Sequence, residues 1–328
     1  MPDANRAPAA DASHTGFVRV RLLIAASLLT AAFAAGASAR PSAAPSPAAL
    51  LDRYVPVLVL HPAEQLAPAP VDGFLADADL EHRAASGWEP APGPVPTGGA
   101  DLRLDQRACA AIDGPAATPC YAASEAAHGG RSVVYGAALR RGSRTELQYW
   151  IWYAWDVYSP TVPPGELWQV HEGDWEAVSV VVDTAGRPLL VGYSEHGKGV
   201  RRDWAKAPKQ GTHPLAYVAL GSHANYPSPG THPFDPRVVD SLFISVIRQN
   251  GQAPVDHTGR GRVVRPRLVR VSATSPAWMA FAGGWGEDGY LRVPGGQPQS
   301  YSATGPKGPA FHEQWRRPVA DVLSWPRA

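Results

Sequence analysis

One stretch of the sequence decides the fold: Leu147–Trp155, which reads LQYWIWYAW. Eight of its nine residues are apolar or aromatic, a composition typical of a β-strand that is buried on both faces. Turns rich in glycine and proline separate it from further short strand patterns, at residues 54–60, 177–183, 189–194, 215–220 and 263–271. Only residues 236–249 show a helical pattern. Many short strands between turns predict an all-β protein, an antiparallel β-sandwich with long loops and few short helices, formed as a single domain by residues 51–328.

The charges of the chain are balanced, with 30 Lys and Arg against 29 Asp and Glu. A formal net charge of +1 gives no basic face for nucleic acid, so we expect no nucleic-acid partner. The 34 Pro and 32 Gly among 328 residues stay below the roughly 25–30 % that marks disordered chains. Composition therefore favours a loop-rich globular protein and excludes a coiled coil.

The N-terminal segment reads as a secretory signal. Arg19 and Arg21 precede an apolar run over residues 22–36, which small residues follow at 37–39. A basic flank, a short apolar run and a small-residue exit are the three parts of a signal peptide, and a membrane span needs about 20 apolar residues. We therefore expect a signal peptide over residues 1–39, a Pro/Ala linker over residues 40–50, and a secreted or periplasmic protein. In such an oxidising compartment Cys109 and Cys120 are expected to form a disulfide.

The strongest chemical motif is HEGDWE, residues 171–176. Because side chains alternate along a strand, Asp174 and Glu176 should share a core-facing side with Val178, and Trp175 should point the opposite way. Two buried carboxylates without a partner are costly. A divalent cation would resolve this, with His171 adding a nitrogen from the preceding turn. Such a donor set fits Mg²⁺, Ca²⁺ or Mn²⁺, with Zn²⁺ as a further option; the alternative is a solvated turn in which the acids pair with arginine or backbone amides.

Other polar positions can complete this site. Asp156 follows the aromatic strand and is either a fourth metal ligand or a turn cap. Residues 192–197 nearly match a hydrolase nucleophile elbow but have one residue too many before the second glycine. The GSHANY motif, residues 221–226, places polar side chains at the end of a strand. The side chains that we expect to contact a ligand are His196, His223, Trp175 and Asn225.

Together these motifs resemble the vacuolar protein sorting-associated protein 62 family. The resemblance runs over residues 53–316 and includes YVPVLVLHP at 54–62, HEGDWE, YSEHG at 193–197, GSHANY, and GPKGP at 305–309. The His-x-x-Asp-x-Glu pattern is also similar to the heptapeptide of necrosis- and ethylene-inducing-like proteins, secreted β-sandwich cytolysins that hold a divalent cation and bind sphingolipid headgroups. That similarity implies His171, Asp174 and Glu176 as ligands and Asp156 as the upstream aspartate. Val170, Glu172 and Gly173 depart from the heptapeptide.

The resulting expectation is a secreted binding protein rather than an enzyme. It would use a divalent cation and nearby tryptophans to hold a glycan or a lipid headgroup, and a membrane surface stays open as a partner. One alternative is a hydrolase in which the metal activates water while His223 or Glu172 moves protons. Another is a cytolysin, which would need an exposed apolar rim, with the face that carries Trp175 as its candidate.

Overall fold

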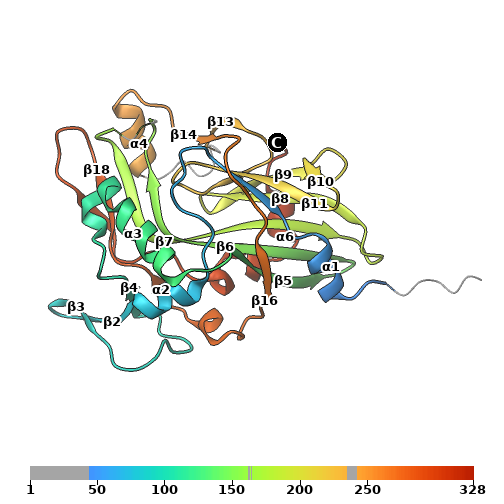
Figure 1. Cartoon of the computed structure of the whole chain (residues 1–328), viewed down its shortest axis with the longest axis horizontal. Coiled ribbons are helices and arrows are strands. Elements are labelled where there is room, and N and C mark those ends of the chain that lie inside the picture. Colours follow the sequence, from blue (N-terminus) through green and yellow to red (C-terminus); the bar gives the residue numbers. More distant parts are fainter. Residues whose placement is uncertain (1–43, 162, 164, 235–241) are drawn as a thin grey trace, which may run out of the picture. The chain divides into compact units, whose positions relative to one another are not determined.

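The computed structural model describes residues 44–161, 163, 165–234 and 242–328 (Figure 1). The predicted signal peptide and the first residues of the predicted linker lie outside this part, as does the beginning of the helical pattern over residues 236–249. Among the described helices, none is both long and apolar enough to span a membrane.

Two long antiparallel strands run through the middle of the protein, β6 (Arg144–Tyr158) and β7 (Trp168–Val182) (Figure 1). The stretch at residues 147–155 lies within β6, as predicted. The largest sheet has eight strands in the order β16-β5-β6-β7-β18-β19, with β8 pairing to β7 and β9 pairing to β8. Its other members are β5 (Val133–Arg141), β8 (Pro188–Glu195), β9 (Lys198–Asp203), β16 (Arg267–Arg270), β18 (Gly289–Arg292) and β19 (Gln299–Ser302).

Three smaller sheets complete the strands. One contains β1 (Val57–Leu60), β10 (Lys209–Gln210), β11 (His213–Val218), β12 (Asn225–Tyr226) and β15 (Val263–Val264). The second contains β2 (Asp79–Ala84), β3 (Gly87–Pro90), β4 (Leu102–Asp105) and β17 (Gly284–Trp285), and the third pairs β13 (Gly230–Pro233) with β14 (Val255–Thr258). The predicted all-β sandwich is confirmed. Most ladders are antiparallel, and short parallel pairs join β1 to β11, β5 to β16, and β4 to β17.

The strand predicted over residues 263–271 is wrong in one respect. It is two strands, β15 and β16, which belong to different sheets. Pro266 lies between them, and because proline has no N–H to donate to a ladder, it separates the two segments.

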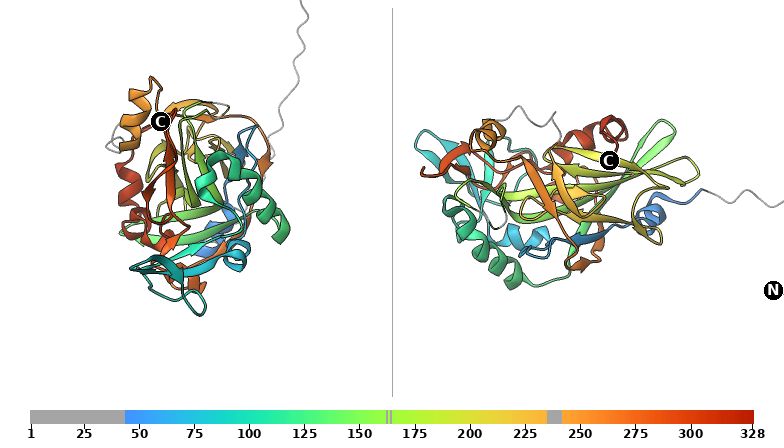
Figure 2. Two further views of the ribbon diagram at one scale, coloured as in Figure 1. Left: turned by 90° about the vertical axis from the view of Figure 1, so that its left-hand side faces the viewer. Right: turned by 90° about the horizontal axis from the view of Figure 1, so that it is seen from above.

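The helices are short and lie at the periphery. They are α1 (Pro47–Arg53), α2 (Val71–Asp77), α3 (Thr118–His128), α4 (Leu242–Gln249), α5 (Glu313–Arg316) and α6 (Ala320–Ser324), with 3₁₀ turns at Ala111–Ala117, Ala277–Ala280 and Pro309–Phe311. In both views of Figure 2 the strands lie between α2 and α3 on one side and the C-terminal helices on the other. Helix α1 begins at Pro47, so the end of the predicted linker is helical. The predicted disulfide between Cys109 and Cys120 is confirmed.

An aromatic core holds the central strands. Trp152 of β6, Trp175 of β7 and Trp285 of β17 contact one another with ring centroids 4.9–5.4 Å apart, and Trp152 and Trp285 have no exposed surface. Burying aromatic rings of this size contributes strongly to stability. This cluster fixes one face of β7, and the opposite face carries the polar groups described next.

The middle of β7 has a strand neighbour on only one side. Strand β18 pairs with residues 168–170 of β7, and β8 pairs with residues 178–182. Between these two contacts, in the described part of the chain, residues 171–177 pair only with β6. The HEGDWE motif therefore lies where the neighbouring strands diverge, and its backbone is open to side-chain partners.

Candidate metal centre

The alternation along β7 follows the prediction for three residues of the motif. Asp174 hydrogen-bonds His223, whereas Trp175 packs into the aromatic core on the other face. Glu176 lies on the side of Asp174 and accepts a hydrogen bond from Ser194. His171 was predicted to lie in a turn before the strand, which is wrong, because the motif is inside β7 and His171 is opposite Asp156 of β6.

Gly173 breaks the alternation between His171 and Asp174. Its φ is +68°, a conformation that glycine adopts without strain. A Cβ at this position would lie 1.9 Å from the carbonyl oxygen of Trp285, so no other residue fits without displacing that backbone. The irregularity lets His171 and Asp174, which are three residues apart, reach the same place.

Asp156, His171 and Asp174 form a group whose candidate ligand atoms all lie within 4.8 Å of one another. His171 Nδ1 donates a hydrogen bond to the carbonyl oxygen of Gly173, 2.7 Å away. Because Nδ1 carries that proton, the neutral ring has its lone pair on Nε2, which is 3.8 Å from Asp156 Oδ1. A histidine that donates one nitrogen to a carbonyl while offering the other is the usual arrangement of a metal ligand. Two carboxylates and this nitrogen suit Mg²⁺, Mn²⁺ or Ca²⁺.

Glu176 does not belong to this group, in contrast to its prediction as a ligand. It lies two residues further along the strand, and Ser194 donates to its carboxylate. Burial and the nearby charge of Asp174 raise the pKa of Glu176 well above its usual range. Burial likewise raises the pKa of Asp156 to about 6, although His171 opposes the shift. Both shifts show that anionic carboxylates are costly here without a positive charge.

A second layer supports the group from the neighbouring sheet. His223, in the loop between β11 and β12, has Nδ1 3.1 Å from Asp174 Oδ2 and Nε2 3.8 Å from Glu64 Oε1. Its ring stacks on Tyr153 at 3.8 Å and is completely buried. Burial lowers the pKa of His223, but the hydrogen bond to Asp174 and the nearby carboxylate of Glu64 outweigh it and raise that pKa to about 10. His223 is therefore an imidazolium that orients Asp174.

The other predicted ligand contacts lie elsewhere. His196 is paired with Asp256, its Nε2 2.8 Å from Oδ2, and Asp256 also accepts from Ser222 and Tyr226. Burial lowers the pKa of His196, but the charge of Asp256 outweighs it and raises that pKa to about 9. Asn225 is completely buried, so it does not meet a ligand at the surface.

Trp175 was predicted to contact a ligand, and the face that carries it was the candidate for an exposed apolar rim in the cytolysin alternative; the rim is contradicted. The ring of Trp175 is 4 % exposed because it packs against three other tryptophans. The proton-transfer role considered for Glu172 is also wrong, because this side chain points to the opposite face from Asp174. There its carboxylate accepts hydrogen bonds from the backbone N–H groups of Gln106 and Glu287.

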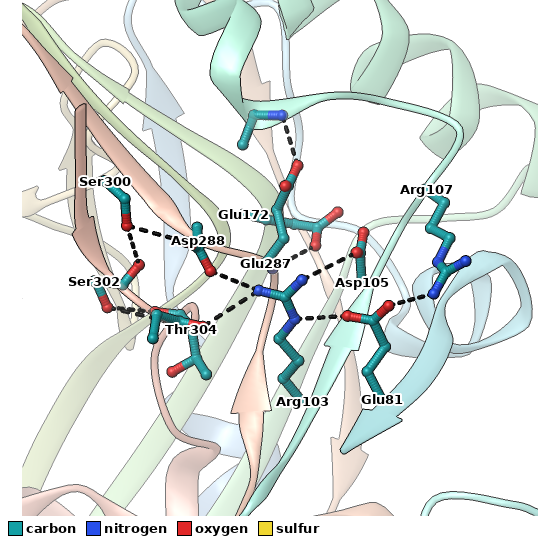
Figure 3. A network of polar contacts seen from close by, with 12 residues as sticks. Glu81, Arg103, Asp105, Arg107, Glu172, Glu287, Asp288, Ser300, Ser302 and Thr304 are labelled. Atoms are coloured by element: carbon teal, nitrogen blue, oxygen red, sulfur yellow. Dashed lines mark hydrogen bonds and ion pairs between the residues drawn. The ribbon is translucent and has the colours of Figure 1, made fainter. Parts of the chain in front are cut away.

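The opposite face of β7 holds a different polar network, which Figure 3 shows. Arg103 of β4 donates to Glu81 and Asp288 at 2.7 Å and lies 3.4 Å from Asp105. Arg107 adds a second guanidinium beside Glu81. Here arginine side chains and backbone amides compensate the carboxylates, and the sequence motif did not indicate this network.

The matching family model is that of vacuolar protein sorting-associated protein 62, and it covers residues 34–290. The chain belongs to this family. Two relatives come from Saccharomyces cerevisiae. The putative vacuolar protein sorting-associated protein TDA6 is 26 % identical over 196 residues, which cover 50 % of this chain and 40 % of that protein. Vacuolar protein sorting-associated protein 62 is 27 % identical over 214 residues, covering 54 % and 43 %. The chain thus spans about two fifths of the length of these relatives.

Among the solved structures similar to this member of the vacuolar protein sorting-associated protein 62 family is one described as a toxin fold for microbial attack and plant defense. NLPPya in complex with glucosamine has a TM-score of 0.41 at 14 % identity, covering 86 % of this chain and 92 % of that one. Necrosis and ethylene inducing protein 2, from the causal agent of cocoa's witches' broom disease, has a TM-score of 0.32 at 17 % identity, covering 70 % and 74 %. At these TM-scores the similarity carries no inference about function.

A cavity of about 510 Å³ lies beside the second layer of the site in this family member. Glu64 and Gly221 line it together with mainly apolar side chains, among them Leu66, Val157 and Leu220. The carboxylate of Glu64 lies 3.8 Å from His223 Nε2 and accepts hydrogen bonds from the backbone N–H groups of Leu66 and Gly221. Glu64 was not predicted, since a single acid shortly after a strand pattern is too common in sequences to distinguish.

Proposed function

We propose that this chain is a secreted binding protein that holds a divalent cation with Asp156, His171 and Asp174. The observation that carries the proposal is the convergence of these three side chains with His171 Nε2 free to coordinate. Mg²⁺ and Ca²⁺ take six or more ligands. Three protein ligands therefore leave positions for the hydroxyls of a sugar or the oxygens of an anionic lipid headgroup. Residues 1–39 support export as a signal peptide.

The surroundings of the three ligands favour binding at an accessible site. The side chain of His171 is 24 % exposed, whereas those of Asp156 and Asp174 are about 10 % exposed. Tyr301 of β19 is an exposed aromatic residue whose hydroxyl lies 3.4 Å from the carbonyl oxygen of Val170. It takes the place of Trp175 as the ring that can stack on a sugar, because amphipathic aromatic rings suit such contacts.

Hydrolysis is the less well supported function for the same site. A general base needs a pKa near neutral pH and must lie within reach of the water that it activates. His223 is completely buried behind Asp174, and its pKa is raised to about 10, so it holds its proton. Glu172 lies on the other face of the sheet. We therefore propose binding rather than catalysis.

Thermal unfolding after chelation tests the cation site, with Ca²⁺, Mg²⁺, Mn²⁺ and Zn²⁺ added singly. A cation at 100 times its dissociation constant should stabilise the protein by about 2.7 kcal/mol. Asp174→Asn should lose this stabilisation. Glu172→Gln is the matched control, because it makes the same chemical change two residues away on the opposite face, and it should keep the stabilisation. No shift with any cation, or equal shifts in both variants, would disprove the site.

Ligand binding is tested separately once a cation is found. Calorimetry with glucosamine, and sedimentation with vesicles that contain anionic lipid, should detect binding only when the cation is present. Tyr301→Ala should weaken binding of the sugar while leaving the thermal shift with the cation unchanged. Binding that persists in chelator would show that the ligand does not use the metal.

A further inference from the structure

The C-terminal segment docks on the body of the protein as an extended strap. We define the strap as residues 320–328, which begin with α6. Its anchors are Val322 and Trp325, which are 0 % and 2 % exposed. They pack with Val181 of β7 and Leu190 of β8 in a hydrophobic cluster separate from the main core. The strap thus has an interface of its own, and the family model ends before it, at residue 290.

The groove under the strap is shaped for the tryptophan. Two glycines of the hairpin β8–β9 lie beneath it. A Cβ at Gly192 would be 2.8 Å from Val322 and 3.0 Å from Trp325, and a Cβ at Gly199 would be 2.6 Å from Trp325. Side chains at these positions would exclude the indole, so the missing Cβ atoms make the groove.

The strap also extends the sheet edge at β9. The N–H of Arg201 donates to the carbonyl oxygen of Pro326 at 2.8 Å, and the N–H of Ala328 donates to the carbonyl oxygen of Arg201 at 3.0 Å. The guanidinium of Arg201 adds a hydrogen bond to the carbonyl oxygen of Trp325 at 2.8 Å. Backbone pairing with an open strand edge, together with a side-chain pocket, is a general mode of peptide recognition.

A strained hinge joins the strap to the body. Val319 has φ +66° and ψ −46°, and the N–H of Ala320 donates to the carbonyl oxygen of Pro318 at 2.7 Å. This is a γ-turn with positive φ, which is rare and strained, and a β-branched residue is poorly suited to it. The N–H of Val319 donates to the buried carboxylate of Glu146, which holds the turn in place. The protein therefore keeps the strap on its own body at a conformational cost.

We propose that two copies of this chain exchange their straps, each strap docking in the β8–β9 groove of the other copy. Exchange makes every contact of the strap again in the partner, so the closed and exchanged forms differ mainly at the hinge. An open hinge lets Val319 return to a negative φ in both copies. Strained short hinges favour such swapping, and the gain offsets the cost of association at high protein concentration. The occupant of the groove in the dimer is the same sequence that fills it in the monomer.

The test is the molar mass of the full chain, measured by light scattering after size-exclusion chromatography over a range of concentrations. Val319→Gly relieves the strain, because glycine tolerates positive φ, and it should raise the dimer dissociation constant at least tenfold. Val319→Ala is the matched control. It removes nearly as much of the side chain but keeps the strain, so it should dimerise as the original chain does.

Two further variants keep the proposal falsifiable. Val319→Pro cannot adopt the closed hinge, so its folded form should be dimeric at all accessible concentrations. Trp325→Ala removes the anchor and should abolish the dimer. A monomeric, folded Val319→Pro protein would overturn strap exchange, as would a dimer that survives in both Val319→Gly and Trp325→Ala. Strap exchange would also be overturned if the original chain and the Val319→Ala variant stay monomeric at every protein concentration measured.

Discussion

Two carboxylates on one strand, Glu172 and Asp174, meet opposite environments on the two faces of β7. Toward β4, Glu172 accepts from two backbone amides, and the nearby acids surround the guanidinium of Arg103 (Figure 3). Toward β11, Asp174 meets Asp156 and two histidines, His171 and His223, and no arginine contacts it among the described residues. On the first face, arginine side chains supply a permanent positive charge to the carboxylates. On the second face the carboxylates contact histidines, so a divalent cation would supply positive charge that the Arg103 face already has.

The largest effect is expected from a substitution on the Arg103 face of β7. Arg103→Met should destabilise the protein by about 3–5 kcal/mol, because it removes the guanidinium beside the buried acids Glu81 and Asp105 and leaves Glu81 with the half-exposed Arg107. Urea unfolding measures the loss, which should be the same in chelator and in excess Ca²⁺. A loss below about 1 kcal/mol would show that backbone donors suffice for this cluster.

The second prediction concerns Asp156 on the opposite face of β7, where stability should depend on a bound cation. Asp156→Asn should leave stability unchanged or increase it in chelator, since it removes one of two mutually repelling carboxylates. In saturating cation the same variant should be less stable than the original chain by about 2–3 kcal/mol. Unfolding curves in both media provide the test. An equal loss in both would mean that Asp156 has only a structural role.

The pH dependence of the chelated protein should separate the two faces. The pKa of His196 is raised to about 9, so its stabilising pair with Asp256 is complete below pH 6.5 and is lost as pH rises through 9. At about 1.4 kcal/mol per pKa unit, the shift of the His196 pKa from 6.5 to about 9 corresponds to a loss of about 3 kcal/mol in the free energy of unfolding. On the Arg103 face, burial raises the pKa of Glu287 to about 7. The folded state therefore binds more protons than the unfolded state between pH 4.5 and 7, and the free energy of unfolding falls as the pH rises through that window.

Two amide substitutions assign these windows. His196→Gln should make the decline above pH 6.5 shallower without abolishing it, because the pKa of His223 is raised as well, and it should leave the acidic decline unchanged. Glu287→Gln should make the acidic decline shallower without abolishing it, because Asp156 and Glu176 keep their raised pKa values, and it should leave the alkaline decline unchanged. Denaturant midpoints across pH 4–10 give the measurement. Substitutions that change both windows together would show that the two faces titrate as one system.

The smallest effect is expected at the rim of the Arg103 network. Arg107 pairs with Asp79 at 3.2 Å and with Glu81, but its side chain is 46 % exposed, against 8 % for Arg103. Arg107→Met should therefore cost less than about 1 kcal/mol. It is also the control for Arg103→Met, and a comparable loss in both variants would contradict the difference in burial.

Local regularities of the sequence were enough to predict several features. The apolar stretch in β6 predicted a buried central strand, and alternation correctly placed Asp174 and Trp175 on opposite faces of β7. The cysteine pair was predicted as well, because the two cysteines lie close together and have no other partner in the chain. Each of these depends on neighbours in the sequence, and strand periodicity or short loop closure is decided at that range.

The tertiary structure alone decided which residues make the site. The register of β6 against β7 brings Asp156 opposite His171, and the positive φ of Gly173 brings His171 to the side of Asp174, while alternation favoured Glu176. Glu64 and His223 come from segments distant in the sequence, and the aromatic core takes Trp175 away from the surface. Strand register, backbone irregularities and packing between sheets are set by long-range contacts that no local pattern encodes. The sequence by itself thus determined the strand and its two faces, and the fold decided which side chains meet on each face.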